Sequence, residues 1–257
     1  MSSFIHPTAL IAPSAKIANE VNIGPFCIVE DNVVIKSGTS LKSSVYIGHN
    51  TSIGHDCQIF QNTVIGEIPQ DLKYGGEDTK LIIGNRTKIR EFCTINRGTK
   101  ANGKTIIGDD CLLMAYVHIA HDCLIGDNII LANGVQSGGH VEIQDWAIIG
   151  GMTPIHQFTK IGCHTFIGGG YRIVQDIPPY ILATGEPLKY SGVNNVGLRR
   201  RGFPPDVRNL IKKIYKIIFK STSNLSDAIK LINDKDKKTK EIKVILDFIK
   251  NSNRGLI

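Results

Sequence analysis

Two histidines three residues apart, with a carboxylate beside the second, form the stretch of the chain best suited to chemistry. This stretch is His118-Ile119-Ala120-His121-Asp122-Cys123. A neutral imidazole, whose ordinary pKa is ~6.5, can take a proton from a substrate hydroxyl, so His121 is a candidate general base. Imidazoles can also hold a zinc ion that keeps one position open for a substrate. The residue types alone leave both chemistries open.

A repeat of six residues surrounds this stretch and must position it. Isoleucine, leucine or valine occupies 25 of the 29 positions spaced six apart from Ile5 to Ile173. This period is neither helical nor a simple alternation, and it is typical of parallel β-helices built from short strands and turns. Three strands make one triangular coil of 18 residues, and successive coils pair about 4.8 Å apart. The exceptions are Asp71, Glu77, Ala101 and Ser137.

Two polar segments that contain glycine are expected to leave the coil as loops, near 68–80 and 98–104. Loops that leave a rigid solenoid often carry function. The β-helix is expected over 1–187 and a basic α-helical domain over 188–257. Its first helix should begin at Pro204-Pro205-Asp206, a second should run from about Leu225 to Ile232, and a third should carry Ile242 to Ile249.

The charge is divided unevenly along the chain. The net charge is +7, yet residues 188–257 hold seventeen lysines and arginines against six aspartates and glutamates. This asymmetry favours an anionic partner: an acidic protein, a phosphorylated ligand, nucleic acid or a lipid surface. The sequence shows neither an export signal nor an apolar run of ~20 residues, so a cytoplasmic protein is expected.

The cysteines are expected to pack inside the coil rather than form disulfides or bind a metal. Five of the six share one phase of the repeat: Cys27, Cys57, Cys93, Cys111 and Cys123.

The same register gathers most of the histidines on one edge of the prism. Counted around an 18-residue coil, His118, His156, His121 and His140 fall at positions 10, 12, 13 and 14, and Gln157 also falls at 13. His121 and His140 should therefore lie one strand spacing apart, ~5 Å. His164, at position 2, lies elsewhere. Four histidines on one edge favour a functional site.

These features together resemble the UDP-N-acetylglucosamine acyltransferase family over nearly the whole chain. The resemblance rests on Ile23-Gly24-Pro25-Phe26-Cys27, Gln70-Asp71-Leu72-Lys73-Tyr74, the stretch from His118 to Cys123, Gly150-Gly151-Met152-Thr153-Pro154-Ile155-His156-Gln157-Phe158, Asp176-Ile177-Pro178-Pro179-Tyr180 and Gly197-Leu198-Arg199-Arg200-Arg201-Gly202-Phe203. It implies a left-handed parallel β-helix, a homotrimer with active sites between neighbouring prisms, and neither cofactor nor metal. The implied reaction, the first of lipid A biosynthesis, moves an (R)-3-hydroxyacyl group from acyl carrier protein to the 3-position of the UDP-sugar.

The resemblance also implies roles for single residues. His121 matches the general base and Gly139 the backbone oxyanion donor. Asp122 could orient His121, although neighbours on a strand normally face opposite ways. Residues matched to substrate binding are Gln70, Asp71 and Lys73 for the sugar, His118, His140, His156 and Gln157 along the cleft, and Asn194, Arg200 and Arg201 for the nucleotide and diphosphate.

The chain departs from the family pattern at Val196, where better-known members carry a carboxylate that helps to hold the nucleotide. At Gly169 it lacks the bulkier side chain that shortens the acyl pocket in some members, so a long acyl chain is expected. Acyl carrier protein, which is acidic, gives the basic C-terminal region a partner, and the resemblance implies neither nucleic-acid binding nor stable membrane insertion. Two alternatives stay open: a related acyltransferase acting on another sugar nucleotide, such as a 3-amino UDP-sugar, and a zinc-dependent hydratase of the same fold.

Overall fold

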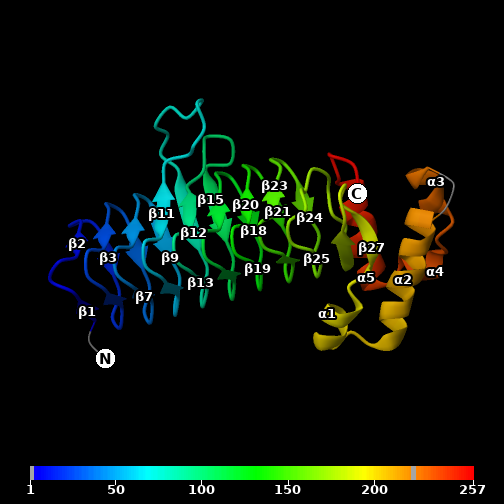
Figure 1. Cartoon of the computed structure of the whole chain (residues 1–257), viewed down its shortest axis with the longest axis horizontal. Helices are drawn as coiled ribbons and strands as arrows, with labels where there is room; N and C mark the ends of the chain where they lie inside the picture. The colour runs from blue at the N-terminus through cyan, green and yellow to red at the C-terminus, as the bar shows by residue number, and fades with distance from the viewer. Residues whose placement is uncertain (1–2, 221–223) are drawn as a thin grey trace.

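Each six-residue repeat folds as a short strand followed by a tight turn, and three repeats complete one turn of a solenoid. The computed structural model describes residues 3–220 and 224–257. It shows a long three-sided prism with helices gathered at its C-terminal end (Figure 1). The prism is a parallel β-helix, as the repeat predicts, and it is left-handed, as the family resemblance implies.

The strands form three sheets, one on each face of the prism. Sheet A contains β1 (Phe4–Ile5), β4 (Asn22–Ile23), β7 (Ser40–Leu41), β10 (Gln58–Ile59), β13 (Lys88–Ile89), β16 (Leu112–Leu113), β19 (Ile130–Leu131), β22 (Ile148–Ile149), β25 (Phe166–Ile167), β26 (Ile181–Thr184) and β27 (Lys189–Val193). Sheet B contains β2 (Leu10–Ile11), β5 (Ile28–Val29), β8 (Tyr46–Ile47), β11 (Val64–Glu67), β14 (Thr94–Asn96), β17 (His118–Ile119), β20 (Gln136–Ser137) and β23 (Pro154–Ile155). Sheet C contains β3 (Lys16–Ile17), β6 (Val34–Ile35), β9 (Thr51–Ile53), β12 (Lys80–Ile83), β15 (Lys104–Ile107), β18 (Leu124–Ile125), β21 (Glu142–Ile143) and β24 (Lys160–Ile161).

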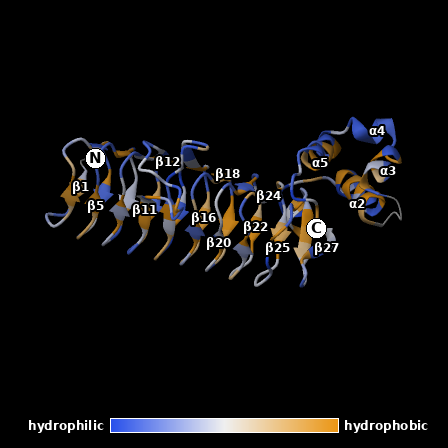
Figure 2. Ribbon diagram, turned by 90° about the horizontal axis from the view of Figure 1, so that it is seen from above, coloured by the Kyte–Doolittle hydropathy of each residue, from blue (hydrophilic) through white to orange (hydrophobic). Residues whose placement is uncertain are grey.

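The aliphatic repeat forms the core of the prism. Ile5 pairs with Ile23 and Ile119 with Ser137, each one coil of 18 residues along. Figure 2 shows apolar strand residues recurring from coil to coil along the solenoid. The five in-phase cysteines are buried in this core and all six cysteines are free, which agrees with a packing role.

The two ejected loops account for three of the four exceptions in the repeat. Across the first loop, Ile65 pairs with Ile95, which is 30 residues away instead of 18, so two extra repeats leave the coil. Across the second loop, Ile95 pairs with Ile119 at a separation of 24, so one extra repeat leaves it. The loops lie between β11 and β12 and between β14 and β15, and both protrude from the same edge (Figure 1). Because whole repeats were added, the register continues unchanged beyond each loop.

Within residues 3–220 and 224–257, the prism ends in a hairpin and five helices. Strand β27 pairs antiparallel with β26 and so extends sheet A, which means that a boundary at 187/188 divides this hairpin. The helices follow: α1 (Asn195–Arg200), α2 (Pro205–Lys220), α3 (Leu225–Lys230), α4 (Asp234–Lys237) and α5 (Lys240–Lys250). Helices α1 and α4 were not expected from the sequence. Among the described residues, no helix is long and apolar enough to cross a bilayer.

Candidate active site

The turns that join sheet B to sheet C carry the histidine edge. His121 and Asp122 lie between β17 and β18, Gly139 and His140 between β20 and β21, and Gln157 between β23 and β24. The ring centroids of His121 and His140 are 5.1 Å apart, as the repeat arithmetic predicts. The two ejected loops leave from this edge as well, so the sequence-predicted edge is one continuous surface.

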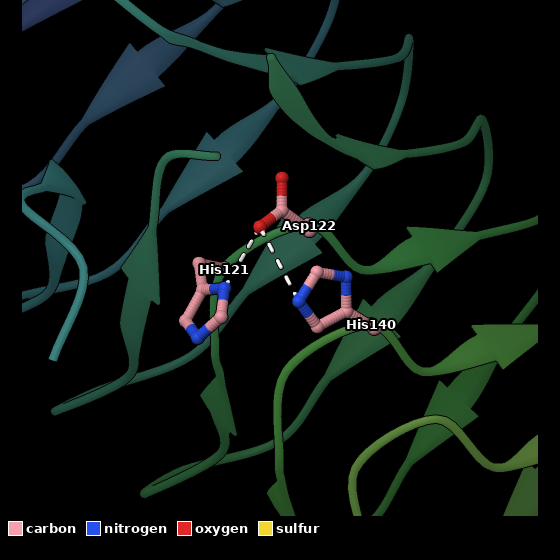
Figure 3. A group of neighbouring side chains, drawn as sticks. All are labelled: His121, Asp122 and His140. Atoms are coloured by element: carbon pink, nitrogen blue, oxygen red, sulfur yellow. Dashed lines mark hydrogen bonds and ion pairs between the residues drawn. The ribbon is translucent and has the colours of Figure 1, made fainter. Parts of the chain in front are cut away.

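His121 and Asp122 form a hydrogen-bonded pair. The Nδ1 atom of His121 donates to Oδ2 of Asp122 over 2.8 Å (Figure 3). The expectation that neighbouring residues face opposite ways is wrong here, because the two residues lie in a turn rather than on a strand. Asp122 has a φ of 60°, in the left-handed region that aspartate tolerates better than most residues. The other ring nitrogen of His121, Nε2, has no hydrogen-bond partner among the described residues.

The second ejected loop encloses the carboxylate of Asp122. Its Oδ1 accepts from the amides of Thr99 at 3.0 Å and Asn102 at 3.3 Å, and its Oδ2 accepts from the Thr99 hydroxyl at 2.6 Å. Burial of the carboxylate acts to raise its pKa. The hydrogen bonds from Thr99 and His121 outweigh burial, so the pKa of Asp122 lies below its ordinary value. Asp122 is therefore an ionised, fully buried partner for His121.

Gly139 lies directly under the His121 ring. A Cβ added to Gly139 would be 2.7 Å from Cε1 and 2.8 Å from Nε2 of His121, closer than real contacts allow. Only glycine lets the imidazole approach the backbone this closely. The Gly139 amide has no hydrogen-bond partner in the described part of the chain and is free to donate to a ligand.

Burial favours the neutral form of two more histidines of the edge, both half-buried. Burial lowers the pKa of His140, and the opposing charge of Asp122 only partly offsets this. Burial also lowers the pKa of His118, whose Nδ1 lies 2.7 Å from the Thr94 hydroxyl. A neutral imidazole can donate or accept a hydrogen bond, which suits contacts to a polar, uncharged ligand.

His121, Asp122 and His140 could together offer three ligand atoms to a metal, since these atoms lie within 4.8 Å of one another (Figure 3). The Nε2 atom of His140 is 3.8 Å from Oδ2 of Asp122. A cation there would have to displace the Nδ1 proton of His121 and compete with the Thr99 hydroxyl for Oδ2. The donor set thus fits a hydrogen-bonded pair better than a metal centre.

The first ejected loop brings Asp71 toward the same edge. Asp71 is close enough to His140 for its charge to act on the pKa of that ring. The Asp71 carboxylate accepts from the Lys73 amide at 2.9 Å. The side chains of Gln70 and Lys73 are exposed. Arg97 fastens the loop: its Nη1 donates to the Gly66 carbonyl at 3.1 Å and its Nη2 to the Tyr74 hydroxyl at 3.2 Å.

His156, Gln157 and Gly169 lie farther along the prism. His156 and Gln157 are exposed at the histidine edge, with Nδ1 of His156 3.1 Å from the Gln157 carbonyl. Gly169 lies in the turn that leaves sheet A after β25, and an added Cβ would be 2.9 Å from the Gly151 carbonyl oxygen. Gly169 is therefore not on the histidine edge of its own chain.

The three residues expected to hold the nucleotide also lie away from that edge. Asn194 and Arg200 line a groove of about 360 Å³ over the outer face of sheet A, whose apolar wall includes Ile148, Phe166 and Leu182. Asn194 also caps α1 by accepting from the Gly197 amide, and it donates to the His164 carbonyl. Arg201 stacks on Trp146, with its guanidinium carbon 5.1 Å from the ring centroid. One chain alone does not bring these residues to His121.

Sequence reasoning missed three residues that organise the site: Arg97, Thr99 and Asn102. They lie in or beside the second ejected loop, which the sequence marked as exceptional only through the broken repeat at Ala101 and its polar, glycine-containing composition. Their partners come from other coils, so no local pattern could reveal the contacts.

Comparison with known proteins agrees with this geometry. A family profile described as a bacterial transferase hexapeptide (six repeats) matches residues 104–136, and one described as Udp N-acetylglucosamine O-acyltransferase, domain 2, matches residues 176–257. The acyl-[acyl-carrier-protein]--UDP-N-acetylglucosamine O-acyltransferase of Thiobacillus denitrificans is 49% identical over 98% of both chains. The protein of the same name from Burkholderia mallei is 46% identical over 99% of both chains.

Solved structures of related proteins have the same fold as this chain. The UDP-N-acetylglucosamine acyltransferase of Francisella novicida has a TM-score of 0.96 at 40% identity, covering 99% of this chain and 94% of that one. The Bacteroides fragilis enzyme also has a TM-score of 0.96, at 44% identity, covering 99% and 100%. The solenoid and its histidine edge thus define a hexapeptide-repeat acyltransferase. Within that class, the chain belongs to the UDP-N-acetylglucosamine O-acyltransferase family.

Proposed function

We propose that the protein transfers an (R)-3-hydroxyacyl group from acyl carrier protein to the 3-hydroxyl of UDP-N-acetylglucosamine, the first step of lipid A biosynthesis. The observation that carries this proposal is the His121–Asp122 pair, in which Nδ1 is hydrogen-bonded and Nε2 is free above the Gly139 backbone. The names of the relatives, which specify an O-acyltransferase using acyl carrier protein, favour a hydroxyl over an amino acceptor.

In the proposed reaction, His121 Nε2 removes the proton of the sugar 3-hydroxyl as its oxygen attacks the thioester carbonyl carbon. The carbonyl oxygen becomes an oxyanion that the Gly139 amide stabilises. The intermediate then collapses, the carbon–sulfur bond breaks, and the thiolate of the carrier takes the proton from His121. Asp122 stabilises the imidazolium that exists between these two proton transfers.

Substrate contacts are assigned from the roles that the family resemblance implies. Gln70, Asp71 and Lys73 on the first ejected loop would hold the sugar nucleotide, and His118, His140, His156 and Gln157 would line the cleft. Asn194, Arg200 and Arg201 would bind the nucleotide and its diphosphate, with guanidinium suited to paired phosphate contacts. Arg200 is exposed and ready to do this, whereas the side chains of Asn194 and Arg201 are already engaged within the chain.

A complete site requires a second copy of the chain. The base lies on the edge between sheets B and C, while the groove with Arg200 lies on the face of sheet A. A homotrimer in which the histidine edge of one prism faces the groove of the next would join the two sets. The apolar wall of the groove, with no side chain at Gly169, would then accept a long acyl chain. The basic residues of 188–257 would dock the acidic carrier protein, in the cytoplasm, where that carrier is found.

The test uses purified protein with acyl-carrier-protein thioesters of several lengths and UDP-N-acetylglucosamine. We expect product with long 3-hydroxyacyl donors, and His121→Ala should lower kcat by at least about 100-fold while the oligomer stays folded. Retention of most activity by His121→Ala would reject the base. Preference for short donors would reject the role of Gly169.

The shared site has its own test. His121→Ala and Arg200→Ala chains, each nearly inactive alone, should regain activity when they are unfolded together and refolded as mixed oligomers. Mixed oligomers contain some interfaces with both intact residues if the site is shared. Activity that stays at the level of the separate variants would show that both residues act within one chain.

A further inference from the structure

One contact of Asp122 has no part in the reaction proposed above. The Thr99 hydroxyl and His121 Nδ1 both donate to Oδ2 of Asp122, over 2.6 Å and 2.8 Å. Thr99, Asp122 and His121 thus form a continuous hydrogen-bonded chain that begins on the second ejected loop and ends at the reactive ring.

Burial makes this contact consequential. Thr99 is 7% exposed and the side chain of Asp122 is 0% exposed, so water cannot take the place of the hydroxyl. Hydrogen bonds to an ionised group are stronger than those between neutral groups, and a dry surrounding strengthens them further. If one donor on Oδ2 is lost, the uncompensated negative charge acts more strongly on the remaining donor, which is His121.

The loop is built around this contact. The Thr99 hydroxyl accepts from the Ala101 amide at 3.2 Å, and the Thr99 carbonyl accepts from the Gly103 amide at 2.7 Å. Asn102 adds its amide to Oδ1 of Asp122 and its side-chain nitrogen to the Asp122 carbonyl. The extra repeat that leaves the coil therefore folds back onto one carboxylate.

We infer that Thr99 is a positioning residue of the acyl transfer: its hydroxyl holds Asp122 so that the carboxylate keeps His121 Nε2 directed at the acceptor. The inference rests on the proposed role of His121 as the base. Thr99 itself touches neither substrate nor reacting atom; it acts through Asp122.

The substitution Thr99→Val removes the hydroxyl and keeps the shape and the amide donor. We expect kcat to fall about tenfold, with the KM for UDP-N-acetylglucosamine changed by less than about twofold. The acidic limb of the profile of kcat/KM against pH should move to higher pH, because the less compensated carboxylate favours the protonated ring. Thr99→Ser, which restores the hydroxyl, should return kcat and the limb toward wild-type values.

Thr39→Val is the matched control. Thr39 is fully buried, and its hydroxyl donates to the Gly54 carbonyl at 2.8 Å in a turn between sheets C and A. Each valine variant loses both hydrogen bonds of a buried hydroxyl, since the Thr39 hydroxyl also accepts from the Cys57 amide at 3.0 Å, as the Thr99 hydroxyl does from the Ala101 amide. Both variants should therefore lower the Tm, but Thr39→Val should leave the acidic limb of the pH profile in place. The inference is overturned if Thr99→Val keeps wild-type kcat and limb, or if it loses kcat with the limb unmoved and no rescue by serine.

A readout without turnover separates this inference from the proposed function. In protein labelled with ¹⁵N-histidine, the imidazole signals of His121 should titrate with a midpoint at higher pH in Thr99→Val than in wild type. If the midpoint of His121 moves but the wild-type protein shows no acyl transfer, the positioning contact is supported and the proposed function is rejected. An unmoved midpoint in an active enzyme would reject the role of Thr99 alone.

Discussion

His121 donates a hydrogen bond through Nδ1 to Asp122, its neighbour in the chain, over 2.8 Å. The turn makes this possible, because Asp122 takes a left-handed φ of 60° and directs its carboxylate back over the imidazole. An imidazole that donates from Nδ1 presents Nε2 as its acceptor while it is neutral. The residue beside His121 thus decides which nitrogen can receive a proton.

Asp122→Asn should therefore lower kcat by about 100-fold or more, because an amide cannot balance the charge of the imidazolium. The asparagine oxygen can still accept from the amides of Thr99 and Asn102, so the protein should remain folded. Steady-state kinetics and a thermal unfolding curve check both statements.

Asp127→Asn is the control for this change. Asp127 also accepts from a backbone amide, that of Asp109 at 2.7 Å, but it lies in a turn between sheets C and A. Its kcat should stay within about twofold of wild type. Equal kcat in the Asp122→Asn and Asp127→Asn variants would contradict a role for the carboxylate in the reaction.

Gly139→Ala should abolish most activity without unfolding the prism. The new methyl group would lie 2.7 Å from Cε1 of His121, and the ring must move aside to relieve the overlap. A displacement of about 1 Å can cost about 100-fold in rate. Gly126→Ala places a methyl group against a carboxylate oxygen of Asp145, between sheets C and A, and should cost stability alone. Loss of kcat in both variants to the same extent would point to general distortion.

Arg97→Met should weaken the binding of the sugar nucleotide and spare the chemical step. The guanidinium joins the first loop to the coil through the Tyr74 hydroxyl and the Gly66 carbonyl, and methionine keeps only the apolar stem. We expect KM for the UDP-sugar to rise about tenfold with kcat within about twofold. Arg90→Met, which removes a surface pairing with Glu91, serves as control. An unchanged KM in Arg97→Met would show that the loop needs no such anchor.

The fold could be predicted because one periodic signal determines it. An aliphatic residue every six positions requires short strands with turns between them, and the 18-residue register then places His121 and His140 one coil apart. The ejected loops were visible for the same reason, since Asp71, Glu77 and Ala101 replace core residues in repeats that leave the coil.

The rest depends on contacts that no period contains. The pairing of His121 with Asp122 follows from a left-handed turn residue, and the enclosure of Asp122 follows from the path of a loop. Helix α1 escaped prediction because it is six residues long and is capped by Asn194, a residue assigned to the nucleotide. The separation of Arg200 from His121 became visible only when the three faces of the prism were assembled.

His164 should make the free energy of unfolding depend on pH. Burial and the facing charge of Arg201 lower the pKa of His164 to about 4, from an ordinary value of about 6.5, although Asp145 opposes the shift. Between these two pH values the unfolded chain binds a proton that the folded chain excludes. The stability is thus complete above about pH 6.5 and falls as the pH drops toward 4, by up to about 3 kcal/mol.

His164→Phe removes the proton site and keeps an aromatic ring between Trp146 and Tyr180, which stack on His164 at centroid distances of 6.1 Å and 5.6 Å. The free energy of unfolding is measured with urea at pH 7, 5.5 and 4.5. One protein concentration is used because assembly contributes to stability. The free energy should fall less on acidification in this variant than in wild type. His55 is an exposed histidine between sheets C and A, the edge that also carries His164. His55→Phe should therefore keep the wild-type dependence of the free energy of unfolding on pH. If His164→Phe lost as much stability on acidification as wild type, the proton that the fold excludes would have to be sought at another residue.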